Sequence, residues 1–255
     1  MRQIVITPAA GKRLIGKAIA VHPAVKTALE SGTVVIVAGT TNAYVAEEIL
    51  AATGEAQEFK RGHFYRGITL PPAKPTTDSG RSPDESTFPG DVVLVNGKWE
   101  KGKEIFDVVD GLREGDVILK GANAVDLVNG RAAILIGHPK AGTIGAALQA
   151  VAGRRVQLIV PVGVEKRIPG DLDELAAIRN APGVKGPRLL PVPGEVVTEL
   201  EAIELLTGVS ADLLAAGGVG GAEGCVWLMV EGTGEQEEKA AELLKAIAGE
   251  APFEA

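Results

Sequence analysis

Short runs of apolar, mostly β-branched residues recur along the chain, and segments with helical periodicity separate them. The runs cover residues 33–38, 91–95, 116–120, 132–136 and 156–162. Continuous apolar runs of this length are typical of strands that are covered on both faces, as in parallel sheets. Because parallel strands need crossover connections, the pattern predicts an α/β protein with a doubly wound, mainly parallel sheet.

The segments between these runs have apolar residues at helical spacing. They predict helices over residues 11–31, with a break near Pro23, and over residues 41–53, 105–112, 141–151 and 172–179. Residues 61–90 differ, because they are rich in Pro, Gly, Ser and Thr and have no sustained period. We expect a long loop or flap there, and long ordered loops are often functional.

The pattern changes after a Pro- and Gly-rich stretch at residues 181–193. The elements predicted from there are a strand near 189–192, a helix over 195–206, an apolar segment broken by glycines at 211–221, a strand over 225–230 and an amphipathic helix over 235–247. This order predicts a small α+β domain of the ferredoxin-like kind. We therefore divide the chain into an α/β ligand-binding core, residues 1–185, and a small domain, residues 186–255.

Charge and cysteine usage narrow the classes of function. The net charge is −7 and no basic stripe with interleaved aromatic residues is present, which argues against nucleic-acid binding. The single cysteine, Cys225, leaves no intramolecular disulfide and no cysteine-based metal cluster, and we expect no metal or other cofactor. No secretion signal and no apolar run of about 18 residues is found, so we expect a cytoplasmic protein without a membrane partner. The apolar run 225–230 would suit a homo-oligomer interface as well as a core.

Loops of glycine and polar residues follow four of the predicted strands directly. Their sequences are GTTN at 39–42, GANAVD at 121–126, GHPKAGT at 137–143 and GVEK at 163–166. In an open parallel sheet such carboxyl-end loops converge on one crevice, where ligands bind. The sequence therefore predicts one ligand site that these loops build together.

Gly39, Thr40, Thr41 and Asn42 are the leading candidates for holding an anion. Gly39 allows close approach of the backbone, and the two threonine hydroxyls lie beside free N–H groups at a predicted helix start. The alternative is that Thr41 or Asn42 is only an N-cap. The loop at 137–143 also precedes a predicted helix and adds three ligand-binding candidates, Lys140, Gly142 and Thr143.

Lys120 ends a buried-type strand, where an ammonium group either reaches solvent or meets an anion. It is a candidate for stabilising negative charge, with Gly121 and Asn123 as ligand contacts in the adjoining loop. The candidates for proton transfer are Asp126, His138 and Glu165. Alternatively, Asp126 stabilises a turn and Glu165 pairs with its neighbour on the surface.

Cations and aromatic residues are dense at the start of the predicted flap, over residues 60–67. Arg61, His63 and Arg66 are candidates for a lid that closes over an anionic substrate. The alternative is that the segment is a solvated loop.

Three segments carry a resemblance to a known family, TVVIVAGTTNAYVAEEIL at 33–50, DVILKGANAVD at 116–126 and LPVPGEVV at 190–197. In this order they resemble the family that unites ribose-5-phosphate isomerase A, glucosamine-6-phosphate deaminase, the DeoR effector domains and the CoA transferases. The first resembles the isomerase segment in which a strand, a Gly-Thr-Gly-Ser-Thr loop and a helix bind the sugar phosphate. The others are similar to its Asp-Gly-Ala-Asp-Glu-Val-Asp loop and to its Pro-Val-Glu-Val entry into a small α+β lid. The resemblance implies a ribose-5-phosphate isomerase/CoA transferase-like fold and a small phosphorylated ligand.

The chain departs from that family at the catalytic positions. Lys120 stands where the isomerase has its first loop aspartate, and Asn123 and Ala124 stand where it has Asp-Glu. The carboxylate that moves the proton in the aldose–ketose reaction therefore has no counterpart. Three functions remain: an isomerase- or lyase-type enzyme acting on a phosphorylated metabolite, a non-catalytic metabolite sensor, and a CoA transferase-like protein with Glu165 or Glu223 as nucleophile.

Overall fold

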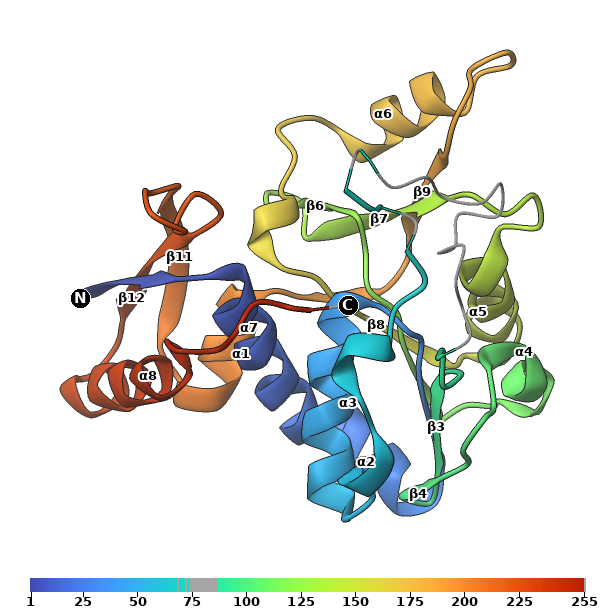
Figure 1. The fold of residues 1–255 in the computed structure, drawn as a ribbon, viewed down its shortest axis with the longest axis horizontal. Coiled ribbons are helices and arrows are strands. Elements are labelled where there is room, and N and C mark those ends of the chain that lie inside the picture. The colour runs from blue at the N-terminus through green and yellow to red at the C-terminus, as the bar shows by residue number, and fades with distance from the viewer. Residues whose placement is uncertain (68, 72, 74–86, 255) are drawn as a thin grey trace.

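A mixed six-stranded sheet lies at the centre of the fold (Figure 1). The computed structural model describes residues 1–67, 69–71, 73 and 87–254. The strands, in spatial order, are β10 (Glu195–Val197), β8 (Gln157–Pro161), β5 (Val117–Leu119), β2 (Thr33–Ile36), β3 (Val92–Val95) and β4 (Lys98–Trp99). The first four run parallel, and β3 and β4 complete the sheet in antiparallel pairing. The predicted α/β class with a mostly parallel sheet is confirmed.

Helices cover both faces of this sheet. One face carries α1 (Pro8–Val21), α2 (Pro23–Ser31), α3 (Thr40–Thr53) and α7 (Glu199–Thr207), and the other carries α4 (Ile105–Val108) and α5 (Gly142–Arg154). Alternate residues of a strand point to opposite faces, so Val34 packs in the cluster with α1 whereas Val35 packs in the cluster with α5. Burial on both faces explains why the strands are continuously apolar in sequence. The predicted break near Pro23 is confirmed, since α1 ends and α2 begins there.

A second, antiparallel sheet corrects one prediction. It contains β6 (Ala124–Asp126), β7 (Arg131–Ile136) and β9 (Arg188–Val192), and α6 (Leu172–Arg179) packs against it. The strand predicted over residues 132–136 exists, but its place in the parallel sheet is wrong. A turn with Gly130 at φ 61° reverses the chain after β6, so β7 pairs with β6 and β9 instead.

The third sheet joins the two ends of the chain. It contains β1 (Arg2–Ile6), β12 (Val226–Glu231) and β11 (Ser210–Ala216), with α8 (Gly234–Ile247) packed beside it. β1 was not predicted, and β11 occupies the first part of the apolar, glycine-broken segment predicted at 211–221. The helix predicted over 195–206 begins at Glu199, because β10 occupies its first residues. β9 pairs with β7, and β10 pairs with β8. β1, at the start of the chain, pairs with β12. Strands from both sides of residue 185 therefore share each of the three sheets.

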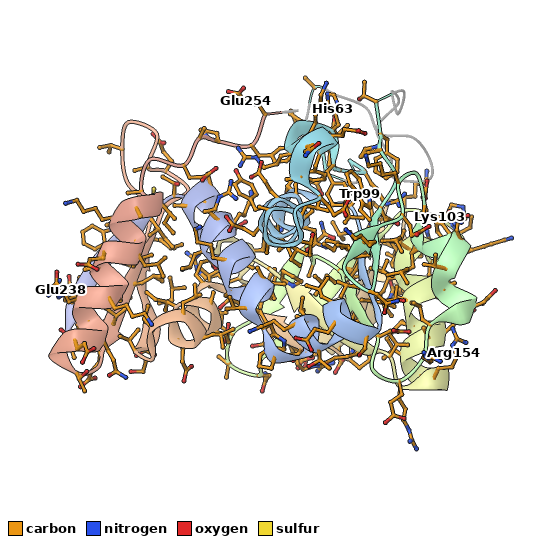
Figure 2. The ribbon with its side chains drawn as sticks, turned by 90° about the horizontal axis from the view of Figure 1, so that it is seen from below. His63, Trp99, Lys103, Arg154, Glu238 and Glu254 are labelled. Carbon is orange, nitrogen blue, oxygen red and sulfur yellow. The ribbon has the colours of Figure 1, made fainter. Side chains whose placement is uncertain are left out.

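The C-terminal segment returns to the central part of the fold after α8 (Figure 1). The Tyr44 hydroxyl donates a hydrogen bond to the Ala251 carbonyl at 3.2 Å, and Phe253 meets the edge of the Tyr65 ring at a centroid distance of 6.0 Å. Figure 2 shows Glu254 near His63 at this contact. Among the helices that the structure describes, none has the length and apolar character needed to cross a membrane.

Candidate functional site

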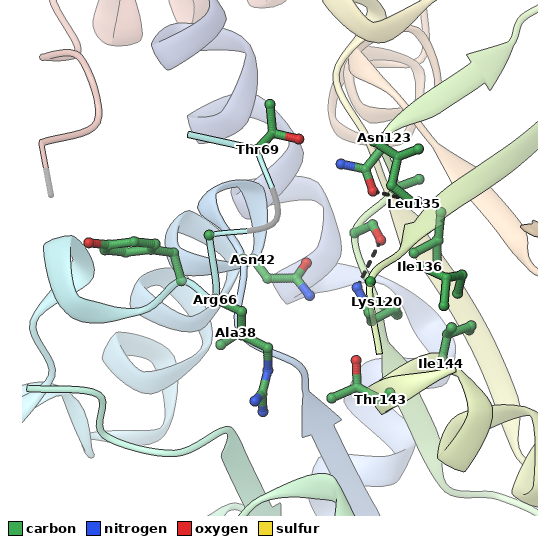
Figure 3. Close-up of a pocket in the computed structure, with 18 of the residues that line it drawn as sticks. Ala38, Asn42, Arg66, Thr69, Lys120, Asn123, Leu135, Ile136, Thr143 and Ile144 are labelled. Carbon is green, nitrogen blue, oxygen red and sulfur yellow. Dashed lines mark hydrogen bonds between the residues drawn. The ribbon is translucent and has the colours of Figure 1, made fainter. Parts of the chain in front are cut away.

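A cavity of about 410 Å³ opens where β2 and β5 end (Figure 3). Volumes of 300–1,000 Å³ are usual for sites that bind small molecules. The strand-end loops that the sequence predicts to converge contribute most of its walls. The predicted site residues that line it are Gly39, Thr40, Thr41, Asn42, Arg66, Lys120, Gly121, Asn123, His138, Lys140, Gly142 and Thr143.

Asp126 and Glu165 do not line this cavity and lie instead at a separate hollow beside β6. Asp126 accepts hydrogen bonds from the Val128 and Asn129 N–H groups at 2.9 and 3.1 Å. A further hydrogen bond from the Asn129 side chain, followed by these backbone bonds, lowers the pKa of the Asp126 carboxyl. The geometry is that of a carboxylate that stabilises the β6–β7 turn.

Two of the three predicted lid residues also lie elsewhere. Arg61 donates hydrogen bonds to Glu47 at 3.0 Å and Glu250 at 2.8 Å, and its guanidinium stacks over the Tyr44 ring. His63 belongs to the same short 3-10 turn and is absent from the cavity wall. The predicted flap includes residues 68, 72 and 74–86, which lie outside the described part of the chain.

Helix α3 begins at the cavity without a side-chain cap. Gly39 is its N-cap residue and the first turn contains no acidic residue, so the interpretation of Thr41 or Asn42 as the N-cap is wrong. Free N–H groups in a first turn attract anions. The Thr41 hydroxyl is buried beside them and has no hydrogen-bond partner in the described part of the chain. Since buried hydroxyls are nearly always bonded, a ligand oxygen would satisfy this group.

Neither the backbone conformation at position 39 nor the surrounding atoms require a glycine there. The φ of 173° at Gly39 is an extended conformation that any residue adopts. A Cβ added there would meet no atom within 4 Å. A glycine at this position therefore leaves open space at the cavity wall where a side chain would otherwise stand.

Asn42 connects the two strands whose ends form the cavity. Its buried Nδ2 donates hydrogen bonds to the carbonyls of Val37 at 2.7 Å and Leu119 at 3.0 Å. These bonds hold the end of β2 against the end of β5. The side chain therefore has a structural role in addition to the ligand contact that the sequence predicts.

Helix α5 is a second uncapped helix that begins at the cavity. Its N-cap residue is Ala141, and its first turn has neither a side-chain cap nor an acidic residue. Ala141 and Gly142 have φ values of 59° and 56°, and a left-handed alanine is strained backbone of the kind found at functional sites. His138 Nδ1 accepts the Lys140 N–H at 3.1 Å, so a neutral His138 ring carries its proton on Nε2.

Arg66 brings a fixed cation to the cavity wall. Its Nη2 donates to Asp91 Oδ1 at 2.8 Å and to Glu104 Oε2 at 3.2 Å. Burial opposes the charge, but these two carboxylates outweigh it and raise the pKa of Arg66. The Nε and Nη1 atoms are buried and have no hydrogen-bond partner among the residues described, so two kinds of donor remain for a ligand.

Asp91 is the buried anchor of this arrangement, and it was not among the predicted site residues. Besides Arg66, its carboxylate accepts the N–H groups of Ala38 and Ile105, each at 2.9 Å. It therefore joins the end of β2, the start of α4 and the Arg66 side chain. The only signal in the sequence is an acidic residue directly before an apolar strand.

Two lysines complete the charged wall. Lys120 Nζ donates to the Gly121 carbonyl at 3.3 Å, and burial followed by repulsion from Arg66 lowers the pKa of this lysine to about 8. Lys166 Nζ donates to the Ala122 carbonyl at 3.1 Å, and burial lowers its pKa as well. Lys166 was not a predicted site residue, although the GVEK loop contains it, because surface pairing with Glu165 was the favoured interpretation.

An apolar wall faces the cations. Figure 3 shows Asn123, Leu135, Ile136 and Ile144 on one side of the cavity, Arg66 and Asn42 on the other, and Lys120 between them. Asn123 Oδ1 accepts the Leu135 N–H at 3.0 Å. None of the described residues that line the cavity is an aspartate or a glutamate. This cavity therefore suits a small anion that also has an apolar or neutral part.

A buried carboxylate lies close to Lys166 but does not line the cavity. Glu199, at the start of α7, accepts the Val164 N–H at 2.8 Å and is 1% exposed. Burial, followed by repulsion from Glu165, raises the pKa of Glu199 to about 8. No pattern in the sequence singled out Glu199. The capping box at Thr198 marks the start of a helix, but it does not indicate whether that helix start is buried or exposed.

No protein-family model matches the chain, and no similar protein is found among curated sequences. The class of the protein is therefore defined by its fold and cavity. It is an α/β protein with a cation-lined pocket at the carboxyl ends of its central parallel strands. Within the described ranges, no group of three His, Cys, Asp or Glu side chains is arranged to hold a metal ion.

Proposed function

We propose that the protein binds a small phosphorylated metabolite, a sugar phosphate or a similar compound, in this cavity, and that it does so in the cytoplasm. The observation that carries the proposal is the composition of the cavity wall. Cations from Arg66, Lys120 and Lys166 line it, whereas no carboxylate does so among the described residues. The uncapped starts of α3 and α5 add free N–H groups at the same cavity.

We further propose that the scaffold is the doubly wound fold of the ribose-5-phosphate isomerase and CoA transferase group, with a ferredoxin-like C-terminal domain and a homo-oligomeric assembly. Helices on both faces of the central sheet support the first part. So does the position of the cavity at the carboxyl ends of parallel strands, where ligands of open α/β sheets bind.

The proposed reaction is acid/base chemistry of the isomerase or lyase type. His138 lines the cavity, and an imidazole can exchange a proton with a ligand. The second candidate function is a non-catalytic metabolite sensor, which the carboxylate-free lining favours. A CoA transferase-like reaction has less support, because its glutamate candidates, Glu165 and Glu223, do not line the cavity.

A thermal-shift screen tests the proposal. Phosphate-containing ligands at about 100 times their Kd should stabilise the fold by about 2.7 kcal/mol, which raises Tm by about 5 °C or more in a chain of this size. The variants Thr40→Val/Thr41→Val and Gly39→Val should fold but lose the shift. Thr53→Val, at the other end of α3, is the matched control and should keep it. An undiminished shift in the cavity variants, or a shift with CoA esters alone, would contradict the proposal.

A further inference from the structure

We propose that Lys120 is an amine nucleophile that forms a Schiff base with a carbonyl group of the bound ligand. The ligand class is thereby narrowed to small phosphorylated aldehydes and ketones. This inference rests on the proposed function, because the same cavity must first hold the anionic group. For the proposed isomerase- or lyase-type reaction, it specifies one covalent step.

The position of Lys120 suits this role. Its side chain reaches into the cavity between the cationic wall and the apolar wall (Figure 3). Its one hydrogen bond within the described part of the chain goes to the Gly121 carbonyl at 3.3 Å, and it has no ion pair there. One N–H satisfies that bond, so the nitrogen lone pair of the neutral amine is left to attack a ligand carbon.

The surrounding charges favour the neutral amine. Arg66 and Lys166 repel an ammonium at this point, and Asp91 is the carboxylate that attracts it. The Asp91 carboxylate, however, already accepts hydrogen bonds from Arg66 and from two backbone N–H groups. Burial and these charges hold the pKa of Lys120 at about 8, so about a tenth of the amine is neutral at pH 7. Desolvation and a neighbouring cation are the usual means of activating a lysine nucleophile.

The other lysines at the cavity are less suited to attack. Lys166 lies near Glu165, whose charge favours its ammonium form, and it donates to a backbone carbonyl at 3.1 Å. Lys140 is exposed on the loop before α5. Lys120, in contrast, is desolvated by burial and lies between cations. Among the described residues, no carboxylate forms an ion pair with it.

The step balances without an oxidant or reductant. The Lys120 nitrogen lone pair forms a C–N bond with the carbonyl carbon, and the C=O π electrons move to oxygen, which takes a proton. The resulting carbinolamine loses that oxygen as water while the nitrogen gives up its hydrogen, and a C=N bond remains. Arg66 and the starts of α3 and α5 would hold the phosphate during this exchange.

Reductive trapping with a matched pair of probes tests the inference. The full chain is treated with glyceraldehyde 3-phosphate and sodium cyanoborohydride, and the modified residue is located by peptide mass spectrometry. Glycerol 3-phosphate, which has the phosphate but no carbonyl, is used alone in a thermal-shift assay. The variants are Lys120→Arg, which keeps the charge, and Lys239→Arg, an exposed control on α8 that does not line the cavity.

We expect Lys120 to be the first lysine modified. At pH 7 its neutral fraction exceeds that of an ordinary lysine on the order of 200-fold, and its rate should level off above pH 8 while that of an ordinary lysine continues to rise. Lys120→Arg should lose this modification, and Lys239→Arg should change neither the modification of Lys120 nor the glycerol 3-phosphate shift. The identification of the modified lysine in the natural chain does not depend on whether either variant folds.

The outcomes separate the two proposals. If glycerol 3-phosphate stabilises the protein but Lys120 is not trapped, or Lys166 is trapped in its place, the Schiff-base inference is wrong and the binding proposal stands. If glycerol 3-phosphate gives no stabilisation and no lysine is selected, both are wrong. Selective trapping at Lys120 that glycerol 3-phosphate suppresses would support both.

Discussion

Replacing Glu199 with glutamine should stabilise the protein at alkaline pH. Glu199 is 1% exposed, and a Cβ at Gly11 would lie only 2.3 Å from its Oε1, so helix α1 closes over it. A glutamine oxygen can still accept the Val164 N–H. The new amide group carries no charge, so the repulsion from Glu165 is removed as well. The substitution removes a buried charge and keeps the shape.

The magnitude follows from the pKa of Glu199, which is raised from 4.5 to about 8 in the folded protein. The folded state holds this proton more tightly than the unfolded state. Its contribution to stability is therefore complete below pH 4.5, decreases as the pH rises, and is lost above pH 8. At about 1.4 kcal/mol per pKa unit the whole window corresponds to at most about 5 kcal/mol. Because part of the shift comes from repulsion by Glu165, we expect Glu199→Gln to gain about 2–4 kcal/mol between pH 4.5 and 8.5 relative to the natural chain.

Urea unfolding at several pH values, followed by circular dichroism, measures this difference. Glu204→Gln is the matched control, because Glu204 is an exposed carboxylate on the same helix, and its effect should stay within about 0.5 kcal/mol at each pH. The reasoning is refuted if the free energies of unfolding of Glu199→Gln and the natural chain differ by a constant amount across the pH range. A less stable Glu199→Gln protein at pH 8.5 would refute it as well.

Three further predictions concern the frame of the cavity. Asn42→Ala should lower the free energy of unfolding by about 2–3 kcal/mol in urea, because the Nδ2 bonds that join β2 to β5 are lost. Asp91→Ala should cost about 3–5 kcal/mol by the same measurement, since it leaves the buried Arg66 charge poorly compensated. Adding Arg66→Ala to Asp91→Ala should then cost less than the two single effects together, and strict additivity would contradict the coupling. Ala141→Gly should raise the unfolding free energy by up to about 1 kcal/mol, because the left-handed conformation no longer strains a Cβ; a loss of stability would show that φ 59° is not strained there.

The sequence predicts individual elements better than it predicts their partners. The buried runs at β2, β5 and β8 are correctly identified because both faces of each strand are covered by helices. The run at β7 is equally apolar, yet it pairs in a separate antiparallel sheet. What decides its partner is the reversal at Gly130, a local backbone conformation that an apolar pattern does not encode. β1 was missed because its partner, β12, is more than 200 residues away in the sequence.

For the site, the loops after β2, β5 and β8 meet because the carboxyl ends of neighbouring parallel strands share one edge of the sheet. The loop at 137–143 also reaches the cavity, but it follows β7 in the antiparallel sheet, so the reasoning from a parallel sheet does not explain its place there. The sequence does not indicate which side chains point into the cavity. Asp126 and Glu165 are in the right loops, but local hydrogen bonds and the course of the chain direct them elsewhere. Lys166 lies next to Glu165 in sequence and nevertheless lines the cavity.

By itself, then, the sequence determined the α/β class and the glycine-containing loops that follow the strands. These follow from local periodicity and from the identity of neighbouring residues. The tertiary structure alone decided that Asp91 holds Arg66, that cations surround Lys120, and that Glu199 is buried against α1 and Glu165. The physical reason is that burial and charge act through space, so the ionisation of a side chain depends on groups that folding brings beside it.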